Sequence, residues 1–322
     1  MSQRSWLHGL VVVLSFWLAG CEKIVLDPND PYENSGNFGT STSATSFDTV
    51  TSSENLSGLF YFPSKNRVAG AHPLVVLTHG FGATFYDYQE YARHLASHGY
   101  IVLGFNYVDT SSDATISRHD HKAIQLKEAI THALQAPAVA SWINPDEIAV
   151  MGHSMGGKIS FLTAAQDSRI KTIIALDPSN AGGPPCNISP ANCANYPAAP
   201  NPGRGHIGVL YQISSASSLI FRSNPDATNP AAEFNAYYFF YGDDAAGHNG
   251  APAPSYYINM GSAAHASYLP AFSTPTPAIV KRSSVAWLKM QFDGIDTSTY
   301  FTGSKMQADI TAKRVVAVVT RL

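Results

Sequence analysis

A serine in a glycine-rich turn is the feature of this sequence most suited to chemistry. Residues 152–156 read Gly-His-Ser-Met-Gly, so Ser154 lies at the centre of a G-x-S-x-G pattern. The residues before it predict a strand over Glu147–Gly152, and those after it predict a helix over Met155–Ala165. A serine on such a junction exposes its Oγ at a helix N-terminus, where the helix dipole favours developing negative charge. The pattern therefore predicts that Ser154 is a nucleophile.

A serine nucleophile needs a base, which is most often a histidine. In sites built on this kind of turn, the chain order is serine, then acid, then histidine. Three histidines follow Ser154, namely His206, His248 and His265. His265 comes just after a predicted strand over Tyr256–Met260, which is where the base is expected. We therefore predict that His265 is the general base.

Two aspartates could orient that histidine. Asp177 follows a predicted strand over Ile170–Leu176, and Asp226 follows the next predicted strand, which begins at Leu219. Both lie where parallel strands end, at the edge of an α/β sheet that usually carries the active site. Both also stand beside a proline, in dipeptides that form turns. Pattern alone leaves the choice between them open.

Stabilising a tetrahedral intermediate requires two backbone N–H groups aimed at its oxyanion. One is expected from Met155, the residue after the nucleophile. The other is expected from the loop that follows an earlier buried strand, where residues 78–82 read Thr-His-Gly-Phe-Gly. The two glycines would let this backbone approach a substrate closely. We therefore predict that Phe81 and Met155 form the oxyanion hole.

These residues must be positioned by strands and helices that alternate along the chain. The apolar run Pro73–Thr78 predicts a strand that is buried on both faces. Further strands are predicted at 58–63, 100–106 and 219–222, and further helices at 86–98, 116–135, 231–240 and 278–292. Residues 315–319 predict a final packed strand or helix. This alternation predicts an α/β fold with a mostly parallel central sheet flanked by helices.

Composition excludes several other classes of protein. The 322 residues carry 45% hydrophobic side chains and a formal net charge of −3, which is unlike a disordered chain. A pI near 6.4 offers no basic footprint for nucleic acid. The sequence contains no nucleotide-binding fingerprint, and we expect no cofactor. The run His119-Asp120-His121 does not predict a metal site, because residues i and i+2 of a helix do not face the same way.

The first twenty residues have the pattern of a signal peptide. Arg4 is their single charged residue, and an apolar stretch too short to span a bilayer comfortably follows it. The stretch ends in Leu-Ala-Gly-Cys21, which resembles a bacterial lipobox, so Cys21 is expected to carry lipid such as palmitate. Glu22 after it favours the outer membrane by the sorting pattern that this resemblance implies. Removal of Arg4 with the signal peptide brings the net charge to −4.

Beyond Cys21, we expect a flexible tether up to residue 55 and one catalytic domain over residues 56–322. Ten of the fourteen residues from Thr40 to Ser53 are serine or threonine, which gives no apolar period. The chain would mature in an oxidising compartment. Cys186 and Cys193, in a proline-rich stretch, are therefore predicted to form a disulfide.

Together these motifs resemble the α/β-hydrolase superfamily, in two of its branches. Gly152–Lys158 with Ile174–Pro178 resembles chlorophyllases and platelet-activating-factor acetylhydrolases, and that resemblance implies Asp177 as the acid. The Met after Ser154 and the tail from Val285 to Phe301 resemble bacterial cutinase-like polyesterases, and that resemblance implies Asp226. An aspartate at position 177 is unexpected in the second branch, so the sequence favours Asp177.

The expected function is that of a serine-dependent carboxylic ester hydrolase of the bacterial cell envelope, anchored by lipid and monomeric. Its substrate would be a small-molecule or polymeric ester, and nucleic acid is not an expected partner. One alternative is a cutinase-like depolymerase of polyester or lipid. Another, from a different class, is a non-catalytic binding lipoprotein on a hydrolase fold.

Overall fold

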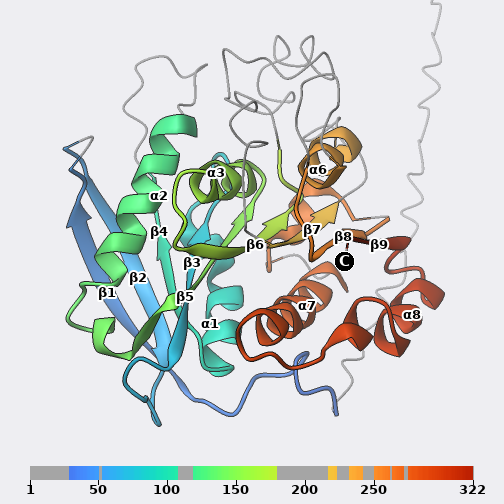
Figure 1. The fold of residues 1–322 in the computed structure, drawn as a ribbon, viewed down its shortest axis with the longest axis horizontal. Coiled ribbons are helices and arrows are strands. Elements are labelled where there is room, and N and C mark those ends of the chain that lie inside the picture. The colour runs from blue at the N-terminus through green and yellow to red at the C-terminus, as the bar shows by residue number, and fades with distance from the viewer. Residues whose placement is uncertain are drawn as a thin grey trace, which may run out of the picture.

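One nine-stranded sheet organises the protein. The computed structural model describes residues 29–50, 53–107, 119–179, 217–222, 232–241, 250–261, 263–271 and 275–321. The strands follow the order β1-β2-β4-β3-β5-β6-β7-β8-β9. The six strands from β4 to β8 run parallel, while β1, β2 and β9 pair antiparallel at the two sides. The predicted fold class, a mostly parallel sheet flanked by helices, is confirmed (Figure 1).

The element bounds agree with most of the ranges expected from the sequence. The strands are β1 Thr40–Asp48, β2 Asn55–Pro63, β3 His72–Thr78, β4 Ile101–Phe105, β5 Ile143–His153, β6 Ile170–Leu176, β7 Ser217–Arg222, β8 Ser255–Asn259 and β9 Ala317–Arg321. The α-helices are α1 Gln89–Ser97, α2 His119–Ala133, α3 Met155–Ala164, α6 Ala232–Tyr241, α7 Pro275–Phe292 and α8 Ser304–Thr311. Short 3-10 helices are η1 Phe85–Tyr88, η2 Ala140–Trp142, η4 His265–Tyr268 and η5 Ser298–Tyr300.

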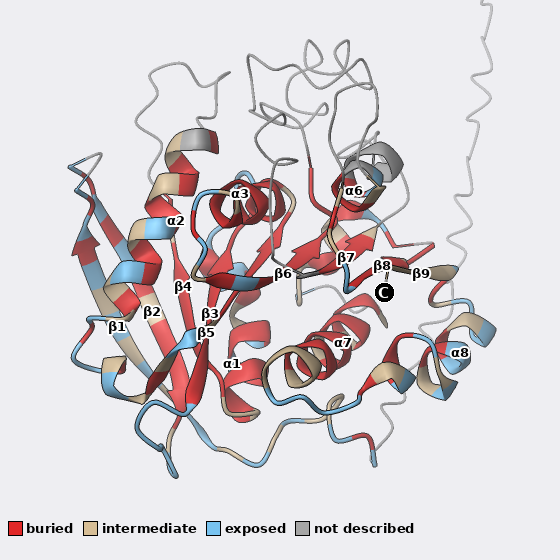
Figure 2. Ribbon diagram, viewed as in Figure 1, coloured by how far each residue is buried: buried red, intermediate tan, exposed pale blue. Residues whose placement is uncertain are grey.

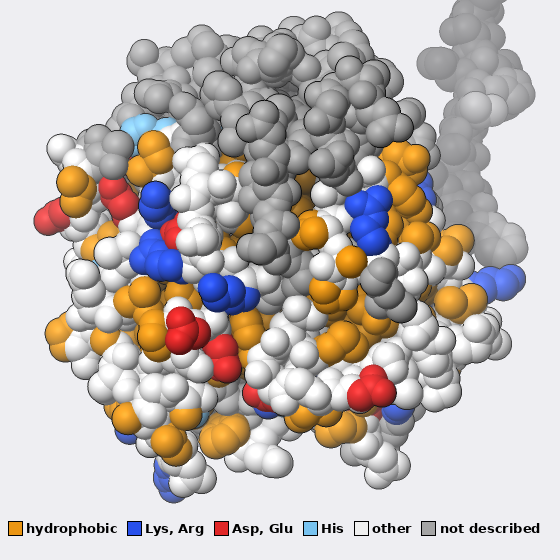
Figure 3. Space-filling view, viewed as in Figure 1, with side chains coloured by type: hydrophobic (Ala, Val, Ile, Leu, Met, Phe, Trp, Pro, Cys, Tyr) orange, Lys and Arg blue, Asp and Glu red, His pale blue; other side chains and the backbone are white. Residues whose placement is uncertain are grey.

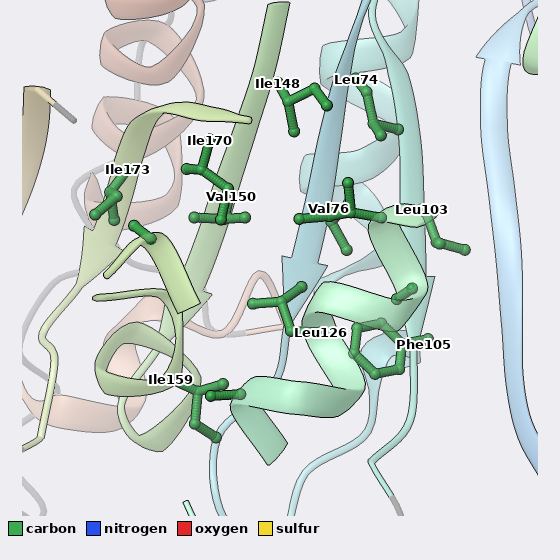
Figure 4. Close-up of a cluster of buried hydrophobic side chains, with 14 of the residues drawn as sticks. Leu74, Val76, Leu103, Phe105, Leu126, Ile148, Val150, Ile159, Ile170 and Ile173 are labelled. Carbon is green, nitrogen blue, oxygen red and sulfur yellow. The ribbon is translucent and has the colours of Figure 1, made fainter. Parts of the chain in front are cut away.

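Two apolar layers hold the helices on the sheet. Helices α2, α3 and α6 pack on one face, and α1, α7 and α8 pack on the other. Alternate side chains of one strand serve both layers, so Leu74 and Val76 of β3 face the first while Val75 and Leu77 face the second. Figure 4 shows strand side chains of the first layer meeting Leu126 of α2 and Ile159 of α3. The central strands are therefore packed on both faces, which holds the residues at their ends in place.

Burial and charge are distributed as expected of a single packed domain. The central strands and helix α3 are buried along their length, whereas helices α1, α2 and α8 also carry exposed residues (Figure 2). On the face seen in Figure 3, charged side chains of the described residues are scattered among apolar and uncharged ones. None of the helices in the described ranges is long and apolar enough to cross a membrane.

Within residues 29–50, the structure differs from the flexible tether that the sequence led us to expect up to residue 55. Residues 40–48 form edge strand β1, which pairs with β2 along nine residues, from Thr40 opposite Pro63 to Asp48 opposite Asn55. Phe47 is buried from this strand and stacks on His132 of α2, with ring centroids 4.5 Å apart. The strand lacks an apolar alternation because, apart from Phe47, its side chains remain at least partly exposed. Its stability comes from backbone pairing and from residues suited to extended structure.

Residues before β1 are also part of the domain. The carboxylate of Asp30 is buried, and it accepts hydrogen bonds from the backbone N–H groups of Tyr32 and Glu33. Its other partners lie at the opposite end of the sequence, where the Tyr300 hydroxyl is 3.2 Å away and the Lys305 ammonium 3.0 Å away. These bonds tie the N-terminal segment to the C-terminal helices, so residues well before the expected boundary at 56 pack as part of the domain.

Two histidines, of which His94 is buried and His98 partly buried, complete this attachment. His94 Nε2 donates to the carbonyl of Tyr32, and His98 Nε2 donates to the carbonyl of Asn34. Burial, followed by the nearby His98, lowers the pKa of His94 to about 3. Burial also lowers the pKa of His98. Both rings are therefore held neutral in the folded protein at ordinary pH.

The free energy of unfolding is expected to decrease as the pH falls from 6.5 toward 4. In the unfolded chain His94 titrates near 6.5, whereas in the folded protein it titrates near 3. Between these values the unfolded chain binds the proton and the folded protein does not, so stability is complete above pH 6.5 and is lost below it. The expected slope is about 1.4 kcal/mol per pH unit for each such histidine. Urea unfolding followed by circular dichroism at each pH measures it.

A His94→Gln variant provides the control for this pH dependence. Its side-chain amide can still donate to the Tyr32 carbonyl but does not titrate. The stability of His94→Gln should therefore depend less steeply on pH between 6.5 and 4. Identical slopes for this variant and the wild type would contradict the assignment.

Candidate active site

Ser154 lies on a strained turn between β5 and α3. Its backbone has φ 55° and ψ −121°, a conformation that L-residues rarely adopt. A Cβ on Gly152 would come within 2.3 Å of Thr78 Oγ1, and one on Gly156 within 2.5 Å of the Thr78 carbonyl oxygen. The two glycines of the motif are therefore required because the turn packs directly against the end of β3. This packing holds Ser154 in place despite the strain.

The structure brings Ser154, His265 and Asp177 together from three strand ends. His265 Nε2 lies 2.8 Å from Ser154 Oγ, and His265 Nδ1 forms a hydrogen bond with Asp177 Oδ2. His265 begins η4, after β8, and Asp177 directly follows β6. All of the Asp177 surface and nearly all of the His265 surface are buried. The predicted grouping of these three residues is thus present in the geometry.

The direction of these hydrogen bonds fixes the tautomer of His265. An ionised carboxylate only accepts, so the Nδ1–H of His265 donates to Asp177. Nε2 is then the nitrogen with a lone pair, and it faces the hydroxyl of Ser154. Asp177 is itself held at φ 44°, with its N–H bonded to the carbonyl of Phe221 at 2.9 Å. This arrangement can take a proton from Ser154 and stabilise the resulting imidazolium.

The loop after β3 passes beside the nucleophile. A Cβ placed on Gly80 would lie 3.2 Å from Ser154 Cβ, so a side chain at this position would crowd the nucleophile. Phe81 follows in a turn that is closed by a bond from Ala83 N–H to the Gly80 carbonyl, at 3.2 Å. Met155 is the first residue of α3, where backbone N–H groups point out of the helix. The location of both residues suits the predicted oxyanion hole, whose role stays a prediction.

Other predicted residues lie outside the described ranges. These are the alternative acid Asp226, the predicted lipidation site Cys21 and the predicted disulfide partners Cys186 and Cys193. The two other histidines that follow Ser154, His206 and His248, also lie there. The lipid and the disulfide stay predictions. Of the two candidate acids, the structure places Asp177 against the base.

The metal-like run in α2 has a different surrounding. His121 Nε2 lies 3.5 Å from Oε2 of Glu54, the residue before β2, and His119 is buried. Burial, with Lys158 and Lys122 nearby, holds the pKa of His119 well below its usual range. Within the described ranges, no group of three or more histidine, cysteine or acidic residues could hold a metal ion.

Comparison with known proteins gives the same fold family. Residues 28–184, which contain Ser154 and Asp177, match a family described as "PETase: PET hydrolase-like". This match agrees with the sheet order and with the serine turn, and the three observations together identify the fold. The chain has the α/β-hydrolase fold.

Several curated relatives of the chain are named cutinases. Cutinase 1 of Thermobifida cellulosilytica is 33% identical over 123 residues, which are 38% of this chain and 44% of that protein. A cutinase of Thermobifida fusca (strain YX) is 33% identical over 123 residues, 38% of each chain. A cutinase of Thermobifida alba is 32% identical over 123 residues, again 38% of each chain. The matched part thus spans less than half the length of these relatives.

These matches support the cutinase-like side of the resemblance expected from the sequence. The aspartate that contacts the histidine does not follow the polyesterase resemblance. The polyesterase resemblance implied Asp226, whereas the residue bonded to His265 in this α/β-hydrolase is Asp177, after β6. The chain therefore joins similarity to cutinases with a histidine-bonded aspartate at the position implied by the chlorophyllase resemblance.

Sequence analysis missed two polar residues behind the site, Tyr88 and His153. The hydroxyl of Tyr88 lies 2.7 Å from His153 Nδ1, and His153 Nε2 lies 3.0 Å from the backbone carbonyl of His265. The N–H of Gly80 bonds to the Tyr88 hydroxyl at 3.2 Å. His153 occupies the first variable position of G-x-S-x-G, which was the one available signal in the sequence.

Proposed function

We propose that this α/β-hydrolase is a serine-dependent carboxylic ester hydrolase that acts through an acyl-enzyme intermediate. The observation that carries the proposal is the set of hydrogen bonds from Asp177 through His265 to Ser154 on a strained turn. Support also comes from the similarity to proteins named cutinases.

The reaction follows from the direction of those bonds. Ser154 Oγ attacks the ester carbonyl carbon while His265 Nε2 takes its proton, and Asp177 stabilises the cation that forms. The backbone N–H groups of Phe81 and Met155 would bind the oxyanion. As the intermediate collapses, His265 returns the proton to the departing alcohol. Water then attacks the acyl-enzyme with the same base, which releases the acid and restores Ser154.

Among esters, we propose polyesters of the cutin type as the substrate class to test first. The family match and the names of the relatives favour them over small soluble esters. A non-catalytic binding lipoprotein is less well supported, because a retired site has no need for a strained serine that is paired with a base and an acid.

A substrate panel tests the proposal. The full chain would be assayed on p-nitrophenyl esters of two to twelve carbons, roughly, and on a solid aliphatic polyester film, and labelled with a fluorophosphonate probe. Labelling of Ser154 together with release of soluble acid from the film supports a polyester hydrolase. Labelling with turnover of short esters only indicates a small-ester hydrolase. Absence of both labelling and turnover would overturn the enzymatic proposal in favour of a binding protein.

We also propose that the protein is attached to the bacterial envelope by lipid on Cys21. The support is the sequence Leu-Ala-Gly-Cys21 at the end of the apolar leader. Bacteria that express the full chain and are fed an alkyne analogue of palmitate should label the wild type and not Cys21→Ser. A Cys186→Ser variant is the matched control and should label like the wild type. Equal labelling of Cys21→Ser would rule out this anchor.

A further inference from the structure

The polar residues behind the active site form one chain of hydrogen bonds whose direction is fixed at both ends. The backbone carbonyl of His265 can only accept, so the Nε2–H of His153 donates to it. In a neutral ring Nδ1 is then the acceptor, and the Tyr88 hydroxyl donates to it. The Tyr88 oxygen accepts in turn from the N–H of Gly80. The chain runs from the loop after β3 to the backbone of the base.

The other side of Gly80 is held by a second histidine. His79 Nδ1 donates to the carbonyl of Gly80 at 2.9 Å, while its Nε2 accepts from the N–H of Tyr107 at 3.3 Å. The N–H of Ala83 donates to the same carbonyl. The carbonyl of Gly80 and the N–H of Phe81 belong to one planar trans peptide and point in opposite directions. Fixing the carbonyl therefore fixes where the Phe81 N–H points.

We infer that Tyr88 and His153 are positioning residues that set the oxyanion loop in register with the catalytic base. This inference rests on the proposed function, because it gives the Phe81 N–H a role in the reaction. The two loops come from the ends of β3 and β8, which are not neighbours in the sheet. The Tyr88–His153 link spans that gap from behind Ser154.

Burial makes the link suited to this purpose. Tyr88 and His153 are at most 5% exposed, so water does not compete for their hydrogen bonds. The rings of His153 and His265 lie 4.6 Å apart at 37°, which adds contact between the link and the base. Burial, followed by the charge of His265, lowers the pKa of His153 to about 3. The ring stays neutral at the pH of catalysis, and its donor and acceptor roles do not exchange.

Removal of one hydroxyl tests the inference. Tyr88→Phe leaves the ring in place but leaves Gly80 N–H and His153 Nδ1 without their partner. We expect kcat for p-nitrophenyl butyrate to fall about 10- to 100-fold with KM within about twofold of the wild-type value, because the loss falls on transition-state geometry. Affinity for a boronic acid, which mimics the tetrahedral intermediate, should fall by a similar factor. Affinity for the product butyrate should not change.

Two further variants separate positioning from stability. Tyr100→Phe removes another buried hydroxyl. Tyr100 directly precedes β4, where the parallel strands begin and away from Ser154, so this variant should leave kcat unchanged. His153→Gln keeps a donor for the His265 carbonyl and should retain more activity than His153→Leu. The double variant Tyr88→Phe/His153→Leu should be no slower than His153→Leu alone, because both changes break the same chain.

The outcomes distinguish this inference from the proposed function. An active wild type whose kcat and boronate affinity are unchanged by both Tyr88→Phe and His153→Leu would overturn the inference alone. Should Tyr88→Phe not fold, His153→Gln against His153→Leu gives the same comparison. A wild type that neither turns over esters nor reacts with fluorophosphonate would overturn both.

Discussion

Replacing Ser154 with alanine is expected to lower kcat for p-nitrophenyl butyrate by about 10⁶-fold, the scale found when a serine hydrolase loses its nucleophile. Ser154 Oγ is the atom that faces the lone pair of His265 Nε2, at 2.8 Å. KM should change little, because the hydroxyl forms a covalent bond during the reaction rather than during binding. Stopped assays over hours, at enzyme concentrations of micromolar order, can measure the residual rate.

A matched glycine variant separates the chemistry from the backbone strain. Ser154 has φ 55°, a value that glycine adopts without strain and alanine does not. Ser154→Gly should therefore be about 1 kcal/mol more stable toward urea than Ser154→Ala, while both are equally inactive. Activity of Ser154→Ala within a factor of ten of wild type would remove Ser154 from the reaction. Equal stability of the two variants would mean that the turn stores no strain.

Replacing Asp177 with asparagine is expected to lower kcat by about 10⁴-fold. The carboxylate accepts from His265 Nδ1–H and so keeps the lone pair of Nε2 toward Ser154. An amide can present its NH₂ group to Nδ1 instead, which favours the wrong tautomer and gives no charge to balance the imidazolium. The loss should appear in kcat. It should be smaller at high pH, where hydroxide can take the proton of Ser154 in place of His265.

Asp226→Asn is the matched control for the acid. It makes the same chemical change at the position that the polyesterase resemblance implied. Its kcat should stay within about threefold of wild type, because the Nδ1 of His265 is already bonded to Asp177. A large loss in Asp226→Asn with a small loss in Asp177→Asn would reverse the assignment.

Local pattern could predict the serine turn because the motif and the strand and helix on either side of it lie within a few residues, although the packing of its glycines against Thr78 could not be seen there. The same holds for His265, which follows the strand that positions it. The choice between Asp177 and Asp226 could not be made from pattern, since both follow strands and only the geometry around His265 separates them. The acid pairs with a histidine 88 residues away, and nothing in local spacing encodes that contact.

The missed parts share a physical cause. Strand β1 gains its stability from pairing with β2, so its own residues carry little apolar signal. Tyr88 and His153 are 65 residues apart in the sequence and meet because β3 and β5 are neighbours in the sheet. Non-local hydrogen bonds of this kind depend on how the whole chain folds. The spacing of apolar residues in a segment reports only which face of that segment is buried.

If Cys21 carries lipid, as proposed, the attachment of the N-terminal segment bears on which way the enzyme faces. That segment packs beside Ser97 and Gly99, where the parallel strands begin, while Ser154 lies where they end (Figure 1). Eight residue steps separate Cys21 from Asn29, and a fully extended chain of that length reaches about 28 Å. With lipid on Cys21, the starting edge of the sheet would rest near the bilayer. The reactive serine would then open toward the surrounding water, so its substrates would arrive from solution or from an external solid rather than from the lipid to which the protein is bound.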